Sequence, residues 1–168
     1  FQTNVAMFVA GKGLGDASTS GLINTSMSAA GMLTGILFGK MQQVLKKLVI
    51  PVSLLVGGIG MLLIFMLGNL PSLFIGAMCC GFCLATINPA GTFQAANAVH
   101  PSISSLAIAI VTAATSVGIF VSPIVSNGVA NLAGGKIEVK FLLAAAGLMA
   151  VGVMSFIGNA ILDKNQTI

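Results

Sequence analysis

The chain alternates between long apolar runs and short breaks that contain lysine, glycine or proline. Five runs reach the roughly 20 residues of helix that cross a hydrocarbon core, at about 17–39, 48–67, 72–96, 103–128 and 139–162. Residues 1–10 form a shorter apolar run, which we interpret as the end of a helix. Because the runs are continuous and do not alternate between apolar and polar positions, they predict α-helices rather than membrane strands. The predicted fold is an all-α, polytopic transmembrane helix bundle, with five complete spans and a partial first one.

Short breaks separate the five spans, so neighbouring spans should run antiparallel. Each break has its own marker: lysines, a Gly-Asn-Leu-Pro turn, a His-Pro-Ser turn or a Gly-Gly pair. In chain order they are Lys40 with Lys46 and Lys47, residues 68–71, residues 100–102 and residues 134–138. None has room for a second, soluble domain, so we expect residues 1–168 to form one transmembrane unit.

The composition indicates a membrane protein. Of the 168 residues, 57% are hydrophobic and 6% are charged, whereas roughly a quarter are charged in soluble domains. Residues 48–135 contain no Asp, Glu, Lys or Arg. The chain has no Arg, Trp or Tyr, which argues against a nucleic-acid surface. We therefore expect the lipid bilayer as a partner, with the lysines as anchors at its borders.

The lysines also indicate an orientation. One face carries Lys40, Lys46, Lys47 and Lys164, and the other carries Lys12, Lys136 and Lys140. Three lysines of the first face crowd one short connection, where the positive-inside bias operates. We therefore expect that face and the carboxyl terminus in the cytoplasm, with the protein in the cell membrane. The start at Phe1, without a basic leader, leads us to expect a fragment of a longer chain.

Small residues recur at every fourth position in two of the spans. One line is Gly31, Gly35 and Gly39, and the other is Ala114, Gly118, Ser122, Ser126 and Ala130. Positions four apart share a helical face, and small side chains let two membrane helices approach closely. We interpret both lines as packing seams; the alternative is that 21 glycines produce such lines by chance.

Polar side chains divide the spans into two kinds. Spans 48–67 and 139–162 are nearly bare, whereas the other three carry polar stripes. The stripes are Ser20, Asn24 and Ser28, then Thr86, Asn88 and Thr92, then Thr112, Thr115 and Ser116. A polar group is costly in lipid without a partner, so these faces should meet one another or a water-filled cavity. For a single Ser or Thr, an interhelical hydrogen bond is the plainer interpretation. Asn88 precedes Pro89, which frees backbone carbonyls and favours a cavity.

No cluster of reactive side chains indicates an enzyme, a metal site or a cofactor. Cys80 and Cys83 have the spacing of metal ligands but lack further ligands, so we interpret them as packing residues. The single histidine, His100, lies in a turn without a neighbouring acid. We assign the lysines to the span borders, and expect neither a proton carrier nor a counter-ion for a charged solute in these spans.

The first lysine-containing break carries a recognisable motif. Gly35-Ile36-Leu37-Phe38-Gly39-Lys40-Met41, followed by Lys46-Lys47, resembles the loop that joins the eighth and ninth helices of the major facilitator superfamily. The acidic residue often found in the family at the position of Gly39 and the glycine before the paired lysines are absent here, which weakens the case for a gating ion pair at this loop. The resemblance implies a partial seventh helix followed by helices eight to twelve. The polar stripes then fall on the eighth, tenth and eleventh helices, which face the central cavity in that family.

The resemblance implies a secondary active carrier for a small solute, in which two six-helix halves alternate access to a central site. The candidate cavity residues are Asn4, Asn24, Ser28, Asn88, Thr92 and Thr115. The implied partners are a small-molecule substrate and an amino-terminal half of the same chain, within a monomer that has no cofactor. If transport is proton-coupled, we expect the titrating acid in that other half.

Two other classes remain open at this stage. The membrane subunit of an ATP-driven transporter, or another polytopic permease, would need a coupling helix in a cytoplasmic loop longer than any found here. A channel or a non-transporting scaffold is the third class. A channel would need a pore ring supplied by several copies.

Overall fold

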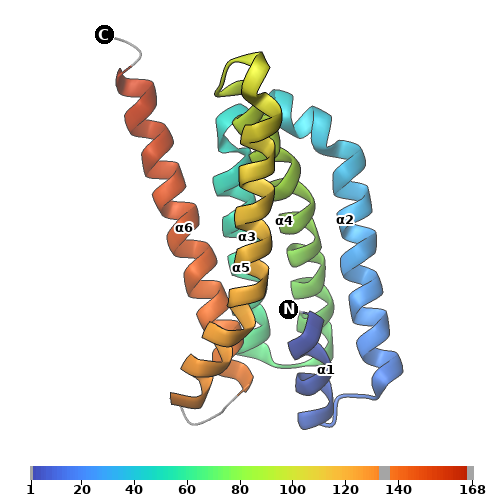
Figure 1. Ribbon diagram of the computed structural model, residues 1–168. Helices are drawn as coiled ribbons and strands as arrows, with labels where there is room; N and C mark the ends of the chain where they lie inside the picture. The colour runs from blue at the N-terminus through green and yellow to red at the C-terminus, as the bar shows by residue number, and fades with distance from the viewer. Residues whose placement is uncertain (1, 133–136, 166–168) are drawn as a thin grey trace.

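The computed structural model describes residues 2–132 and 137–165, in which every regular element is a helix (Figure 1). The elements are α1 (Gln2–Gly11), α2 (Ala17–Leu45), η1 (Lys46–Leu48), α3 (Val49–Leu67), α4 (Leu70–Asn97), η2 (Pro101–Ile103), α5 (Ser104–Leu132) and α6 (Ile137–Asn165). The predicted all-α bundle is confirmed. The five predicted spans correspond to α2 through α6, and four of these helices are a few residues longer than predicted.

Four continuous helical stretches in the described chain are long and apolar enough to cross a membrane. The first, Ala17–Leu67, contains both α2 and α3, because the short 3-10 turn η1 follows α2 and precedes α3 directly, with no non-helical residue assigned between them. These two helices nevertheless run in opposite directions (Figure 1). The count of four stretches and the predicted five spans therefore differ only at this turn.

Local sequence explains where the helices begin. Asp16 caps α2, because its carboxylate accepts a hydrogen bond from the Thr19 backbone N–H at 3.1 Å. Asn69 caps α4 reciprocally: its Oδ1 accepts from the Ser72 N–H at 3.1 Å, and Ser72 Oγ accepts from the Asn69 N–H at 3.2 Å. Gly68, with a φ of +57°, lets the chain turn between α3 and α4. The predicted Gly-Asn-Leu-Pro break is thus a glycine turn followed by a helix cap.

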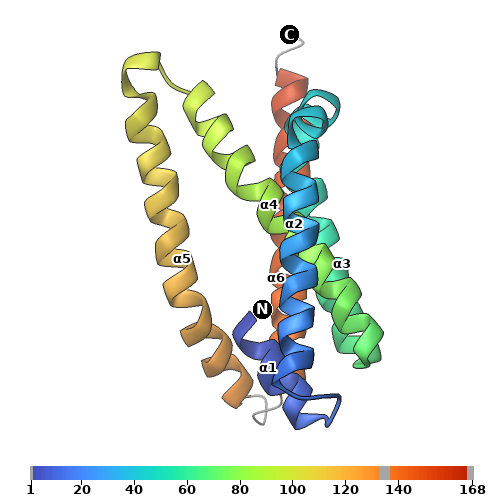
Figure 2. The same cartoon turned by 90° about the vertical axis from the view of Figure 1, so that its right-hand side faces the viewer.

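α3 is the central helix of the bundle. It packs along α4 and also along α6, and α4 packs in turn against α2. α5 lies apart from this group, with fewer contacts to α4 and α6 (Figure 2). The turns η1 and η2 and the carboxyl end of α6 lie at one end of the bundle, which we call the lysine end because it contains Lys46 and Lys47 (Figure 1). Residues 11–16 and the α3–α4 turn lie at the opposite end.

Glycines allow four helix backbones to approach closely. A Cβ added to Gly81 of α4 would lie 2.0 Å from the Met27 carbonyl oxygen of α2. One added to Gly60 of α3 would lie 2.5 Å from Cys79 Cβ of α4, and Gly58 faces α6 at a similar distance of 2.6 Å. Lipid tails are as apolar as leucine, so this close van der Waals contact is what holds membrane helices together.

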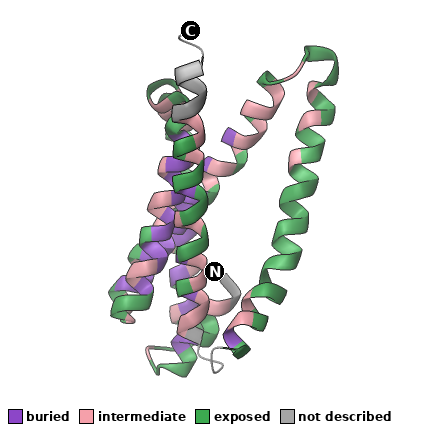
Figure 3. Cartoon of the chain, turned by 90° about the vertical axis from the view of Figure 1, so that its left-hand side faces the viewer, coloured by how far each residue is buried: buried purple, intermediate pink, exposed green. Residues whose placement is uncertain are grey.

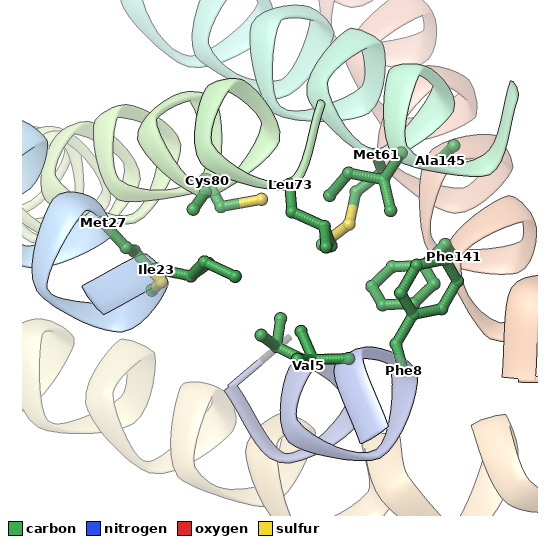
Figure 4. Packing of buried hydrophobic residues seen from close by; sticks show 12 residues of the cluster. Val5, Phe8, Ile23, Met27, Met61, Leu73, Cys80, Phe141 and Ala145 are labelled. Carbon is green, nitrogen blue, oxygen red and sulfur yellow. The ribbon is translucent and has the colours of Figure 1, made fainter. Parts of the chain in front are cut away.

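A cluster of buried hydrophobic residues lies between α1, α2, α3, α4 and α6 (Figure 4). At its edge, Phe8 of α1 contacts Phe141 of α6 edge to face, with ring centres 5.3 Å apart. α5 contributes no residue to this cluster. Its apolar segment is 0% buried within the bundle, and Figure 3 shows exposed residues along most of its length.

Candidate functional site

α4 and α5 enclose a cavity of about 250 Å³ that contains three of the predicted cavity residues. Asn88 and Thr92 line it from α4, and Thr115 lines it from α5. The other lining residues are Ile87, Gly91, Val111, Thr112 and Ser116. Because a short connection makes α4 and α5 neighbours, the polar stripes of the two helices face one another across this cavity.

The hydroxyl groups of the α4–α5 cavity donate hydrogen bonds within their own helices. Thr92 Oγ1 lies 3.1 Å from the carbonyl oxygens of both Asn88 and Pro89, and Thr115 Oγ1 lies 2.9 Å from that of Val111. Their lone pairs remain available to accept hydrogen bonds from water or a solute. The Asn88 side chain makes no hydrogen bond with the described chain, so it offers both a donor and an acceptor.

Asn24 and Ser28 do not line the α4–α5 cavity. They lie on α2, where Ser28 is exposed and donates to the Asn24 carbonyl oxygen at 3.1 Å. Asn24 Oδ1 is buried and has no hydrogen-bond partner in the described chain. These two side chains therefore form a separate polar spot, which the structure does not bring together with Asn88.

Asn4 lines a second cavity, of about 260 Å³, between α1, α3, α5 and α6. Lys140, in the first turn of α6, lines the same cavity and donates a 2.7 Å hydrogen bond to Asn127 Oδ1 of α5. Lys140, which we assigned to a span border, therefore also lines a cavity. Lys140 is the fourth residue of α6, close to the start of the predicted span at residue 139.

An ion pair joins the turn after α1 to the first turn of α6. Lys12 Nζ lies 2.6 Å from Glu138 Oε1, and the two side chains are 37% and 35% exposed. The same ammonium lies 5.0 Å from the centre of the Phe8 ring, within range of a cation–π interaction. Exposed pairs of this kind contribute about 0–1 kcal/mol, so the contact orients α1 more than it stabilises the bundle.

The lysine end has a larger, open hollow of about 830 Å³. Lys46 and Lys47 line it from η1, and Lys46 has a φ of +48°, which reverses the chain after α2. Asn159 of α6 donates a 2.7 Å hydrogen bond to the Lys47 carbonyl oxygen. Sequence reasoning missed the amide side chains here because they lie at or beyond predicted span ends; they are Gln42, Gln43, Gln94 and Asn97.

Most of the predicted loop motif is helical. Gly35, Gly39 and Lys40 lie within α2, and only Lys46 and Lys47 lie in the turn. A Cβ added to Gly35 or Gly39 would meet no atom within 4 Å. The connection is therefore shorter than predicted, because α2 continues to Leu45.

The predicted packing residues differ in their surroundings. A Cβ on Gly31 would lie 3.5 Å from the Gly81 carbonyl oxygen, at the contact between α2 and α4. A Cβ on Gly118 of α5 would meet no atom within 4 Å, and Ser122 is exposed and lines the second cavity. Of the Gly118 line, Ala130 is buried within the described chain, whereas packing at Gly118 and Ser122 stays a prediction.

The cysteines lie in helix contacts. Cys80 and Cys83 are buried, and a Cβ added to Gly57 of α3 would lie 2.7 Å from Cys83 Sγ. Cys83 therefore occupies the space that the absent side chain of Gly57 leaves. Within residues 2–132 and 137–165, no three His, Cys, Asp or Glu side chains are grouped to hold a metal ion.

Comparison with known proteins connects this bundle to one family. The family model of the Major Facilitator Superfamily matches residues 2–165. Neither curated proteins nor solved structures gave a match. The family match covers nearly the whole chain and agrees with its long apolar helices, which identify an integral membrane protein. The chain belongs to the Major Facilitator Superfamily, a superfamily of membrane transporters.

Proposed function

We propose that the protein is a secondary active carrier that moves a small solute across the membrane by alternating access. The observation that carries this proposal is the α4–α5 cavity, where Asn88 and Thr92 face Thr115. Carriers of this kind bind the solute between packed helices and expose it to each side in turn. The unpaired amide and the free hydroxyl lone pairs supply the contacts that replace part of the hydration of the solute.

An amino-terminal half of the same protein would close this cavity. α5 supports this part of the proposal, because its apolar segment is 0% buried against the present bundle. The exposed residues of α5 include Thr112, Thr115 and Ser116, a polar stripe that acyl chains would not solvate. A second helical half covers such a stripe better than lipid does, and we propose a monomer composed of two halves.

The lysine end would face the cytoplasm of the cell membrane. Lys40, Lys46 and Lys47 all lie at or near this end, as does the carboxyl end of α6. Positive side chains in short connections favour the cytoplasmic side. The second cavity, with Lys140, would then open toward the outside.

Labelling of a single cysteine tests alternating access without knowledge of the solute. In the full-length protein, Cys79, Cys80 and Cys83 are replaced by alanine, and Thr115→Cys is introduced. A membrane-impermeant maleimide is added to right-side-out vesicles and, separately, to inverted vesicles. We expect labelling in both, because a carrier exposes its cavity to each side in turn. Val117→Cys, two positions along α5 and absent from the cavity lining, is the matched control and should stay unlabelled.

Two outcomes would contradict the carrier. Labelling of Thr115→Cys in only one vesicle orientation would mean that the cavity has fixed access. Labelling of a thiol-containing protein trapped inside the vesicles would mean that the reagent crosses the membrane. That result would indicate a channel open to both sides at once.

A further inference from the structure

The second cavity, between α1, α3, α5 and α6, contains a cation that no described acid neutralises. The hydrogen bond of Lys140 goes to Asn127 Oδ1, a neutral acceptor, at 2.7 Å. Of the acidic side chains that the structure describes, Glu138 pairs with Lys12 at 2.6 Å and Asp16 caps α2. Lys140 has intermediate exposure, and its ammonium can therefore form a charge-assisted hydrogen bond with an anion that enters the cavity from solvent.

Other polar groups beside Lys140 are also available. Ser122 and Ser126 of α5 line the cavity, and neither hydroxyl makes a hydrogen bond with the described chain. Earlier on the same helix, by contrast, Thr112 donates to the carbonyl oxygen four residues before it at 2.9 Å. Asn4 adds a side-chain amide that is likewise unpaired within the described residues. A carboxylate can accept hydrogen bonds from an ammonium and from the hydroxyl and amide groups beside it.

The remaining lining is largely apolar and limits the size of a ligand. It includes Met7, Met61 and Phe141, and the cavity volume of about 260 Å³ suits a molecule of a few heavy atoms. One ammonium balances one negative charge. A dianion such as sulfate would exceed that charge and would leave the apolar wall without a contact.

We infer that this cavity binds a small organic monocarboxylate, with its carboxylate at Lys140 and its apolar body against Met61 and Phe141. The inference rests on the proposed carrier in one respect, because it takes the bound anion to be the transported solute. α5 connects the two sites: it lines this cavity through Ser126 and the α4–α5 cavity through Thr115. A solute held at Lys140 can therefore pass along α5 to the α4–α5 cavity.

Equilibrium binding of radiolabelled butyrate to the purified full-length protein tests this inference. Butyrate has one carboxylate on an apolar chain, and butyramide has nearly the same shape without the charge. We expect unlabelled butyrate, but not butyramide, to displace the label. Lys140→Gln should weaken binding roughly ten- to a hundredfold, the loss expected for one charge-assisted contact. Lys140→Arg keeps the charge and should retain binding. Lys40→Gln is the same change at the lysine end and should bind butyrate as the wild type does.

Three results would overturn the inference: no butyrate binding by the wild type, displacement by butyramide, or unchanged binding by Lys140→Gln. If Lys140→Gln does not purify as a monodisperse protein, Ser126→Asp decides instead. Its carboxylate would pair with Lys140 and should exclude butyrate, so continued binding would also overturn the inference.

The vesicle labelling of Thr115→Cys separates this inference from the carrier proposal. Labelling from both sides without butyrate binding would refute only the inference of a bound monocarboxylate. Labelling from one side, together with butyrate binding that depends on Lys140, would refute only the carrier proposal.

Discussion

A single methyl group added at Gly81 should destabilise the bundle strongly. The Cβ of Gly81→Ala would lie 2.0 Å from the Met27 carbonyl oxygen and 2.9 Å from the Met27 carbonyl carbon, which are backbone atoms that cannot rotate away. To bring the shortest contact to 3.0 Å, α2 and α4 must separate by about 1 Å. A gap of that size forfeits roughly a quarter to a half of the dispersion energy of the atoms beside it. Overpacking costs about 1–3 kcal/mol, and we expect the upper part of that range.

Gly147→Ala is the matched control. A Cβ at Gly147 of α6 would meet no atom within 4 Å. Both changes replace glycine by alanine inside a helix, which by itself stabilises the helix by roughly 0.5–1 kcal/mol. Because this gain is common to both variants, their difference in unfolding free energy isolates the contact between α2 and α4.

The chain supplies its own reporter of unfolding. Cys80 and Cys83 are buried, so a thiol-specific fluorogenic dye reacts with them when the bundle opens. We would heat the full-length protein in detergent and follow the dye. The shift is roughly 2–4 °C per kcal/mol for chains of 150–250 residues and smaller for longer ones, so in the full-length protein Gly81→Ala should melt up to a few degrees below Gly147→Ala. Equal melting temperatures would refute the reasoning, because they would mean that the added methyl group requires no separation of α2 from α4.

Two further predictions concern a helix cap and a tertiary hydrogen bond. The Thr19 backbone N–H and hydroxyl donate to Asp16 and lower the pKa of this carboxyl from its ordinary value of 3.8. The stabilisation is therefore complete above pH 3.8 and is lost as the pH falls through the lower, folded-state pKa. Thermal unfolding on acidification should show this loss for the wild type but not for Asp16→Asn, and identical pH profiles would contradict the charged cap. Asn159→Ala removes the 2.7 Å hydrogen bond to the Lys47 carbonyl oxygen and should lower the unfolding free energy by about 0.5–1.5 kcal/mol. An unchanged melting temperature would show that this bond does not hold η1 against α6.

Charge and helix-breaking residues were sufficient to predict most helix boundaries. Residues 48–135 contain no charge, so only the breaks at 68–71 and 100–102 could separate spans there, and α3, α4 and α5 end or begin near them. α2 was predicted too short because Lys40 was assigned to a loop. A lysine has a long aliphatic stem that carries its ammonium to the membrane surface, so α2 can continue past Lys40 to Leu45.

Helix contacts were harder to predict, because spacing identifies a helical face but not what that face meets. Gly31, Gly35 and Gly39 share a face, yet of the three only Gly31 would place an added Cβ within 4 Å of α4. The reason is that α4 crosses α2 at an angle and diverges from the carboxyl-terminal part of α2 (Figure 2). The closest contacts of α3, at Gly58 and Gly60, lie in a span that carries almost no polar residue. The search for polar stripes therefore gave no signal there.

Three of the six candidate cavity residues lie together in one cavity. Asn88, Thr92 and Thr115 line one cavity because consecutive antiparallel helices are neighbours, which the short connection already indicates. Lys140 was missed as a cavity residue because lysines near span ends are usually anchors in the headgroup region. Its hydrogen bond to Asn127 depends on where α5 ends relative to α6, a tertiary feature that no local pattern encodes.

The central position of α3 links the packing of the bundle to the order in which the ribosome makes it. A Cβ added to Gly58 of α3 would lie 3.4 Å from the Ala145 carbonyl oxygen of α6. A Cβ added to Gly152 of α6 would lie 3.2 Å from Leu54 Cβ of α3. Membrane spans enter the bilayer as they are synthesised, so α3 has one flank covered by α4 well before α6 exists. A chain that terminated before Ile137 would leave the Gly58 face open to lipid. Loss of the last helix would thus expose the central helix of the bundle, and cellular proteases that remove incomplete membrane proteins would act on such a chain.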